Sequence, residues 1–86
     1  MEQKSRPVVG PDGNIRTPKQ EDELNKIFAG VFAGQGGKEI IRYLRSITIE
    51  SVAGPAINSN ELMHKEGQRF IVGIIEQRIA RGKNER

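Results

Sequence analysis

The stretch HKEGQRFIVGII, residues 64–75, decides the fold that we predict for this chain. Its apolar residues recur at intervals of three and four, which is typical of an amphipathic helix. Gly67 costs a helix interior roughly 1 kcal/mol relative to alanine. We therefore expect a compensating contact, with a helix backbone or a bulky side chain such as Phe28 or Phe32 packed closely against this glycine. A kink or hinge at Gly67 is the alternative.

The apolar residues of this helix cover more than one of its faces. One stripe contains Ile71, Ile74 and Arg78. A second stripe contains Gln68, Val72, Ile75 and Ile79. Two short helices can cover one stripe, so the rest is expected to face a partner or a second copy of the chain. The candidate partner-binding surface consists of Phe70, Ile71, Ile74, Ile75 and Ile79.

The tetrapeptide Glu66, Gly67, Gln68 and Arg69 is interpreted as a helix-packing motif. Gln68 enters an apolar seam, where its amide is expected to bond a loop carbonyl. Arg69 is expected to pair with Glu66, with Glu61 or with an acidic residue of the first helix. These roles are structural rather than catalytic.

Two shorter helices are predicted before the long one. Thr17 is the predicted N-cap of the first helix, because a proline follows it and Gln20 completes a capping box. The sequence GQGG ends this helix at Gly34, and the second helix starts near Gly37. Its predicted inner stripe contains Ile40, Ile41, Leu44 and Ile47. Residues 46–52 alternate like a strand, but are interpreted as a fraying helix end.

The long helix is predicted to start at residues 58–60, with Asn58 or Ser59 as its cap, and to end near Ala80. Gly82 and the charged residues after it are expected to terminate it. The predicted fold is therefore all-α, a small three-helix bundle with a flexible N-terminal arm. The arm comprises residues 1–16, the helical domain residues 17–82 and a charged tail residues 83–86. A hairpin pairing Val8–Val9 with Ile15 would be marginal alone.

Length and composition indicate that the chain needs a partner. It has 86 residues, no cysteine and 5% aromatic residues. So short a chain buries a small share of its surface, and no disulfide or thiolate metal site adds to its stability. Self-association or another partner is therefore expected. With no signal-peptide core and no apolar run that spans a bilayer, the chain is interpreted as soluble and cytoplasmic, without membrane contact.

Charge is distributed unevenly along the chain. The net charge is +3, and both ends are basic whereas the middle is acidic. The candidate nucleic-acid contacts are Arg78, Arg81, Lys83 and Arg86. A DNA-reading helix makes its base contacts with side chains in its N-terminal part, whereas the candidate basic residues of this helix come late in it. Sequence-specific reading is therefore disfavoured, while nonspecific contact by the basic ends and ordinary solvated helix ends both stay open.

No pattern in the sequence indicates an enzyme. His64 is the single histidine and has no cysteine to share a metal, and a zinc site needs three or four convergent ligands. The serines have no evident base and third partner. GQGGK, residues 34–38, lacks the spacing of a phosphate-binding loop. We therefore predict no catalytic residue, metal, cofactor or small-molecule substrate.

The pattern FxxVF…G…L…EGQR…V…I covers roughly residues 27–80. It consists of Phe28, Val31, Phe32, Gly37, Leu44, the EGQR residues 66–69, Val72 and Ile75. In this pattern the chain resembles a family of short tailed-bacteriophage (Caudoviricetes) proteins of the structural gene block, one of them from a Bordetella phage. EGQR is its specific part. The resemblance implies a non-enzymatic virion or morphogenesis protein.

That resemblance also implies the partners, which would be phage structural proteins or other copies of the chain in a homo-oligomer. The expected location is the host cytoplasm during assembly, or the virion. Two alternatives are a DNA-associated phage protein that uses its basic termini and a host-directed regulatory binder.

Overall fold

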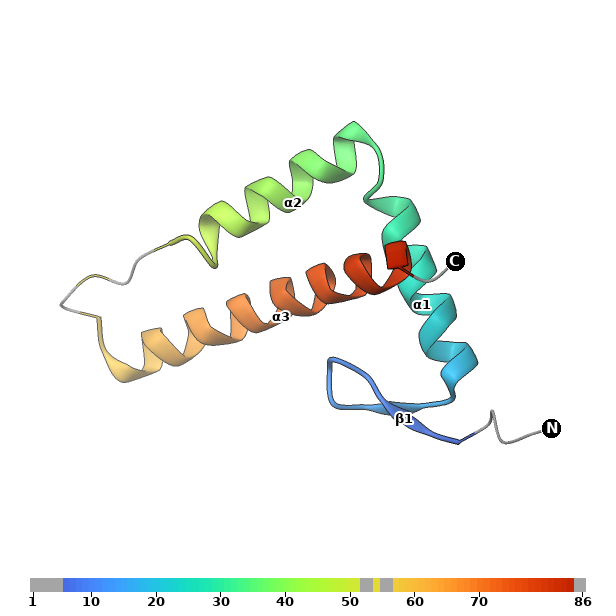
Figure 1. Ribbon diagram of the computed structural model, residues 1–86. Helices are drawn as coiled ribbons and strands as arrows, with labels where there is room; N and C mark the ends of the chain where they lie inside the picture. Colours follow the sequence, from blue (N-terminus) through green and yellow to red (C-terminus); the bar gives the residue numbers. More distant parts are fainter. Residues whose placement is uncertain (1–5, 52–53, 55–56, 85–86) are drawn as a thin grey trace.

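The computed structural model describes residues 6–51, 54 and 57–84. Its elements follow the chain as β1 (Val8–Val9), β2 (Ile15–Arg16), α1 (Pro18–Val31), α2 (Gln35–Ile47) and α3 (Ser59–Asn84) (Figure 1). The strands pair antiparallel, with Val8 opposite Arg16 and Val9 opposite Ile15. The prediction of a mostly helical chain with three helices is confirmed, and residues 6–16 form the hairpin considered for the arm.

Side chains cap α1 and α3 as the sequence predicts. The Thr17 hydroxyl accepts a hydrogen bond from the Gln20 N–H at 3.2 Å, and the Gln20 side-chain oxygen accepts one from the Thr17 N–H at 3.0 Å. Asn58 and Glu61 make the same reciprocal pair at the start of α3, at 2.8 and 3.3 Å. Each pair satisfies N–H groups that have no partner within the helix.

The prediction that α3 ends near Ala80 was wrong, because the helix continues through Gly82 to Asn84. Gly82 lies where α3 crosses α1. A methyl group there would collide with the carbonyl oxygen of Asn25 and would lie 2.7 Å from Cβ of Ala29. This glycine therefore permits close helix packing and does not terminate the helix.

The helices form a thin plate. α3 packs mainly against α1 and only sparsely against α2; α2 and α3 extend to the same side of α1, which meets one end of α3 (Figure 1). The principal-axis extents are 57 × 31 × 13 Å, and the shortest is close to the diameter of about 10–12 Å of one helix. Val72, 4% exposed, is the one buried apolar side chain among the described residues.

Candidate interaction surface

The contact between α1 and α3 is built around a buried ion pair. Arg78 of α3 is 3% exposed, and Glu21 and Asn25 of α1 are equally buried. Nη1 of Arg78 donates to the Glu21 carboxylate and to the Asn25 side-chain oxygen, both at 2.9 Å, and Nη2 reaches the other Glu21 oxygen at 3.3 Å. A buried charge is tolerated only when it is paired. These three side chains therefore depend on one another.

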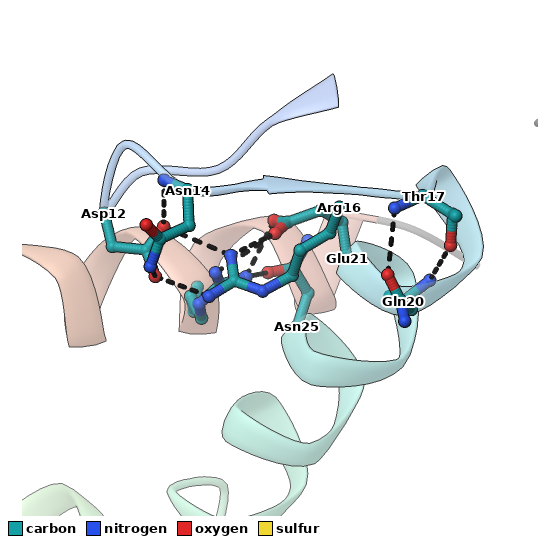
Figure 2. A network of polar contacts seen from close by, with 8 residues as sticks. Asp12, Asn14, Arg16, Thr17, Gln20, Glu21 and Asn25 are labelled. Carbon is teal, nitrogen blue, oxygen red and sulfur yellow. Dashed lines mark hydrogen bonds and ion pairs between the residues drawn. The ribbon is translucent and has the colours of Figure 1, made fainter. Parts of the chain in front are cut away.

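The hairpin is attached to the same carboxylate (Figure 2). Arg16 of β2 donates to Glu21 at 2.7 Å and, through its other terminal nitrogen, to Asp12 at 2.7 Å. Gly10 allows this approach, because a methyl group there would lie 2.6 Å from the Glu21 oxygen. The turn is closed by the Asn14 N–H, which donates to Asp12 at 3.0 Å. Residues 10–16 are thus linked to the helices, which differs from the flexible arm that we expected.

Two guanidinium groups set the charge state of this network. Arg78, and then Arg16, lower the pKa of Glu21 below its ordinary value of 4.5, although burial acts in the opposite direction. The Arg16 side chain and the Asn14 N–H likewise hold the pKa of Asp12 well below its usual range. Both carboxyl groups therefore stay ionised at neutral pH.

The stability of the fold should decrease in acid. A carboxyl group whose pKa is lower in the folded state stabilises the fold above its unfolded pKa, near 4.5 for Glu21, and this contribution is lost as the pH falls through the folded value. Urea denaturation from pH 7 downward should therefore show a falling midpoint below about pH 4.5. Glu21→Gln should flatten this dependence, whereas Glu23→Gln, at an exposed position of α1, should not. An equal pH dependence in all three proteins would contradict the assignment.

The basic residues predicted as nucleic-acid contacts do not form one surface. Arg78 is buried in its ion pair and is not available to a phosphate, so its assignment as a contact was wrong. Arg81 and Lys83 are exposed in the last turns of α3. Arg86 lies outside the described residues. Two of the four predicted contacts are therefore at the surface.

The EGQR motif connects the start of α3 to the end of α2. Arg69 donates at 3.1 Å to the carbonyl oxygen of Thr48, the C-cap residue of α2, and at 2.7 Å to that of Ser51 in the segment that follows. The predicted pair with Glu66 is present at 3.0 Å. Gln68 bonds the ring of His64 at 3.2 Å instead of the loop carbonyl that we predicted, because its side chain lies on the exposed side of the helix.

The close packing predicted at Gly67 is absent. Among the described residues, and apart from its own chain neighbours and helix backbone, no atom lies within 4 Å of the position that a Cβ atom would occupy there. Phe28 and Phe32 stack on one another instead, with ring centroids 6.4 Å apart. The physical reason is the position of α1, which crosses α3 near Gly82 and leaves Gly67 uncovered.

The candidate partner-binding surface is partly exposed. Phe70 and Ile71 face solvent, whereas Ile74, Ile75 and Ile79 are half-buried. Sequence reasoning missed Leu62 and Met63, which extend this surface toward the start of α3. It also placed Ile40 and Ile47 on the inner side of α2, but both are exposed. Helical periodicity places Ile40 and Ile47 on the apolar face of α2. It contains no information on how little α2 contacts α3.

No protein-family model, no curated protein and no solved structure matches this chain. Within the part of the chain that the structure describes, no group of three His, Cys, Asp or Glu residues is arranged to hold a metal ion, and no helix has the length and hydropathy to cross a membrane. The tailed-phage resemblance stays a prediction from the EGQR pattern.

Proposed function

We propose that this chain is a small non-enzymatic protein that acts by binding proteins, as a virion or morphogenesis component of a bacteriophage. The observation that supports this proposal is the imbalance between its apolar side chains and its core. Among the described residues, twelve large apolar side chains are 37–71% exposed. They are Val8, Val9, Ile15, Ile27, Val31, Ile40, Tyr43, Ile47, Leu62, Met63, Phe70 and Ile71. Met63, Phe70 and Ile71 are spaced to share one face of α3, and exposed apolar side chains that gather in one place mark an interaction site.

A protein partner fits the surface better than a nucleic acid. The burial of Arg78 removes one of the candidate phosphate contacts, and the remaining cations at the end of α3 are few. The phage setting is supported by the resemblance carried by EGQR, in which Arg69 pairs with Glu66 and bonds the carbonyls of Thr48 and Ser51 at the end of α2. A host-directed regulator would use the same apolar surface, and the partner distinguishes the two.

The proposal is tested by light scattering coupled to size exclusion at low and high salt. We expect a defined oligomer, or a stable complex with a phage structural protein, that persists at high salt because apolar contacts are not screened by ions. A folded monomer that binds DNA with an affinity falling steeply with salt would overturn it in favour of the DNA-associated alternative. Binding of a host protein, together with absence of the chain from phage particles and assembly intermediates, would overturn the phage role.

A further inference from the structure

One face of α3 is apolar and exposed in the first half of the helix. Met63, Phe70 and Ile71 are 71%, 58% and 56% exposed, and Ile74 is half-buried. With Gly67 they recur at intervals of four, three, one and three, so they share one face of the helix. These five residues are called the α3 stripe below.

The opposite face of α3 is the one that meets α2. Arg69 bonds the carbonyls that follow α2, and Glu76 accepts from Arg45 of α2 at 2.7 and 2.8 Å. Lys65 donates to the Ser51 hydroxyl at 3.3 Å. Because these contacts lie on the far side of the helix, α2 cannot cover the α3 stripe.

Gly67 lies in the middle of the α3 stripe, and no contact among the described residues explains why this position is a glycine. Within the described part of the chain, no atom outside its own helical segment lies within 4 Å of its missing Cβ, and positive φ is found only at Gly13. Neither packing within the chain nor backbone conformation therefore accounts for a glycine that costs roughly 1 kcal/mol. Between large apolar side chains, its missing side chain leaves a notch where a second helix can approach closely.

The uncovered part of this face is centred on Gly67. α1 occupies the C-terminal end of α3, where Arg78 and Gly82 contact Glu21, Asn25 and Ala29. The free segment therefore runs from Ser59 to Ile74. An antiparallel copy placed with the two Gly67 residues face to face would cover one free segment with the other. A parallel copy would bring both α1 helices to the same end, where they would compete for the same space.

We propose that a second copy of this chain docks antiparallel on the α3 stripe, with Gly67 of both copies at the crossing on a two-fold axis. This inference rests on the proposed function and names the partner. In this register Met63 of each copy lies beside Ile71 of the other, so apolar side chains meet on both sides of the axis. The antiparallel arrangement aligns the helix dipoles favourably, and an isologous contact closes with two chains.

The geometry of the free segment favours a second copy over other occupants. In the antiparallel register the free segments of the two copies lie side by side over their whole length. Their apolar side chains then face one another, and the two Gly67 notches coincide. Another protein would have to supply a matching helix with a small residue at its centre.

Single cysteines test the geometry, since the chain has none of its own. Gly67→Cys should form a disulfide-linked dimer under mild oxidation, detected by mass spectrometry without reductant. Gln77→Cys is the matched control, at an exposed position of α3 ten residues away. Two copies of it would lie about 30 Å apart in the antiparallel dimer and should not cross-link. A mixture of Met63→Cys and Ile71→Cys should give the mixed disulfide in preference to either homodimer.

A second pair of variants tests whether the missing side chain of Gly67 is needed for the two copies to associate. Gly67→Gln places a long side chain at the crossing and should raise the dimer dissociation constant about tenfold or more, measured by sedimentation. Gly30→Gln, at another exposed helical glycine with nothing nearby, should leave the dimer unchanged. Circular dichroism of both variants verifies that the helices are retained.

The outcomes separate this inference from the proposed function. A defined oligomer or protein complex in which Gly67→Gln has no effect, or in which Gln77→Cys cross-links as well as Gly67→Cys, would overturn the antiparallel dimer and leave the interaction role intact. A folded monomer that binds no protein would overturn both.

Discussion

Arg78→Ala should leave a large fraction of the chain unfolded at room temperature. The substitution leaves the Glu21 carboxylate in a buried site with only Arg16 to pair it, and it removes a hydrogen bond from Asn25. Removing one partner of a buried ion pair costs about 3–5 kcal/mol. A domain of this size has a total stability of roughly 4–13 kcal/mol, and a chain in which Val72 is the one buried apolar side chain among the described residues belongs near the lower end.

Urea denaturation followed by circular dichroism measures this effect, and the same helix supplies the control. Arg81→Ala removes an exposed arginine three residues away and should change the free energy of unfolding by no more than about 0.5 kcal/mol. Arg78→Lys should fall between the two, because an ammonium group cannot bond the carboxylate in the forked geometry of a guanidinium. Equal stabilities of Arg78→Ala and Arg81→Ala would show that the network contributes little.

Gly82→Ala should destabilise the fold by about 1–3 kcal/mol, although alanine is the better helix former by about 1 kcal/mol. The added methyl group would collide with the carbonyl oxygen of Asn25 and would press on Ala29. The carbonyl belongs to the backbone of α1, so it can yield only if α1 and α3 separate. That separation would also lengthen the hydrogen bonds of Arg78, four residues earlier.

The test is whether each glycine-to-alanine substitution raises or lowers the stability of the fold. Gly30→Ala adds the same methyl group at a helical glycine that has nothing within contact distance, and it should stabilise the fold by up to about 1 kcal/mol. Thermal denaturation of both variants beside the parent chain measures the difference. If Gly82→Ala stabilised the chain as much as Gly30→Ala, the close crossing of α1 and α3 would be refuted.

The local elements of the fold were predictable from the sequence because their causes are local. Thr17 with Gln20, and Asn58 with Glu61, satisfy N–H groups across three residues, so each cap can be recognised within one turn of helix. The three- and four-residue periodicity predicted three helices for the same reason. The pair between Arg69 and Glu66 also lies within one turn.

The candidate surface was predictable only in part. Phe70 and Ile71 were assigned to it and are exposed, but Met63 was not assigned and is the most exposed of the large apolar residues. An apolar pattern shows that a face avoids water, and it contains no information on whether the covering element belongs to the same chain.

Residue type and helical periodicity, which are local features of the sequence, determined that the chain forms three helices and that side chains cap α1 and α3. The tertiary structure alone decided that Gly82 and not Gly67 meets α1, and that Arg78 is buried while Arg81 is exposed. Gly67 and Gly82 are both glycines, Arg78 and Arg81 are both arginines, and all four lie on α3. What separates them is the position of α1, whose Glu21 is 57 residues from Arg78 in the chain, and a contact across that separation leaves no local pattern in the sequence.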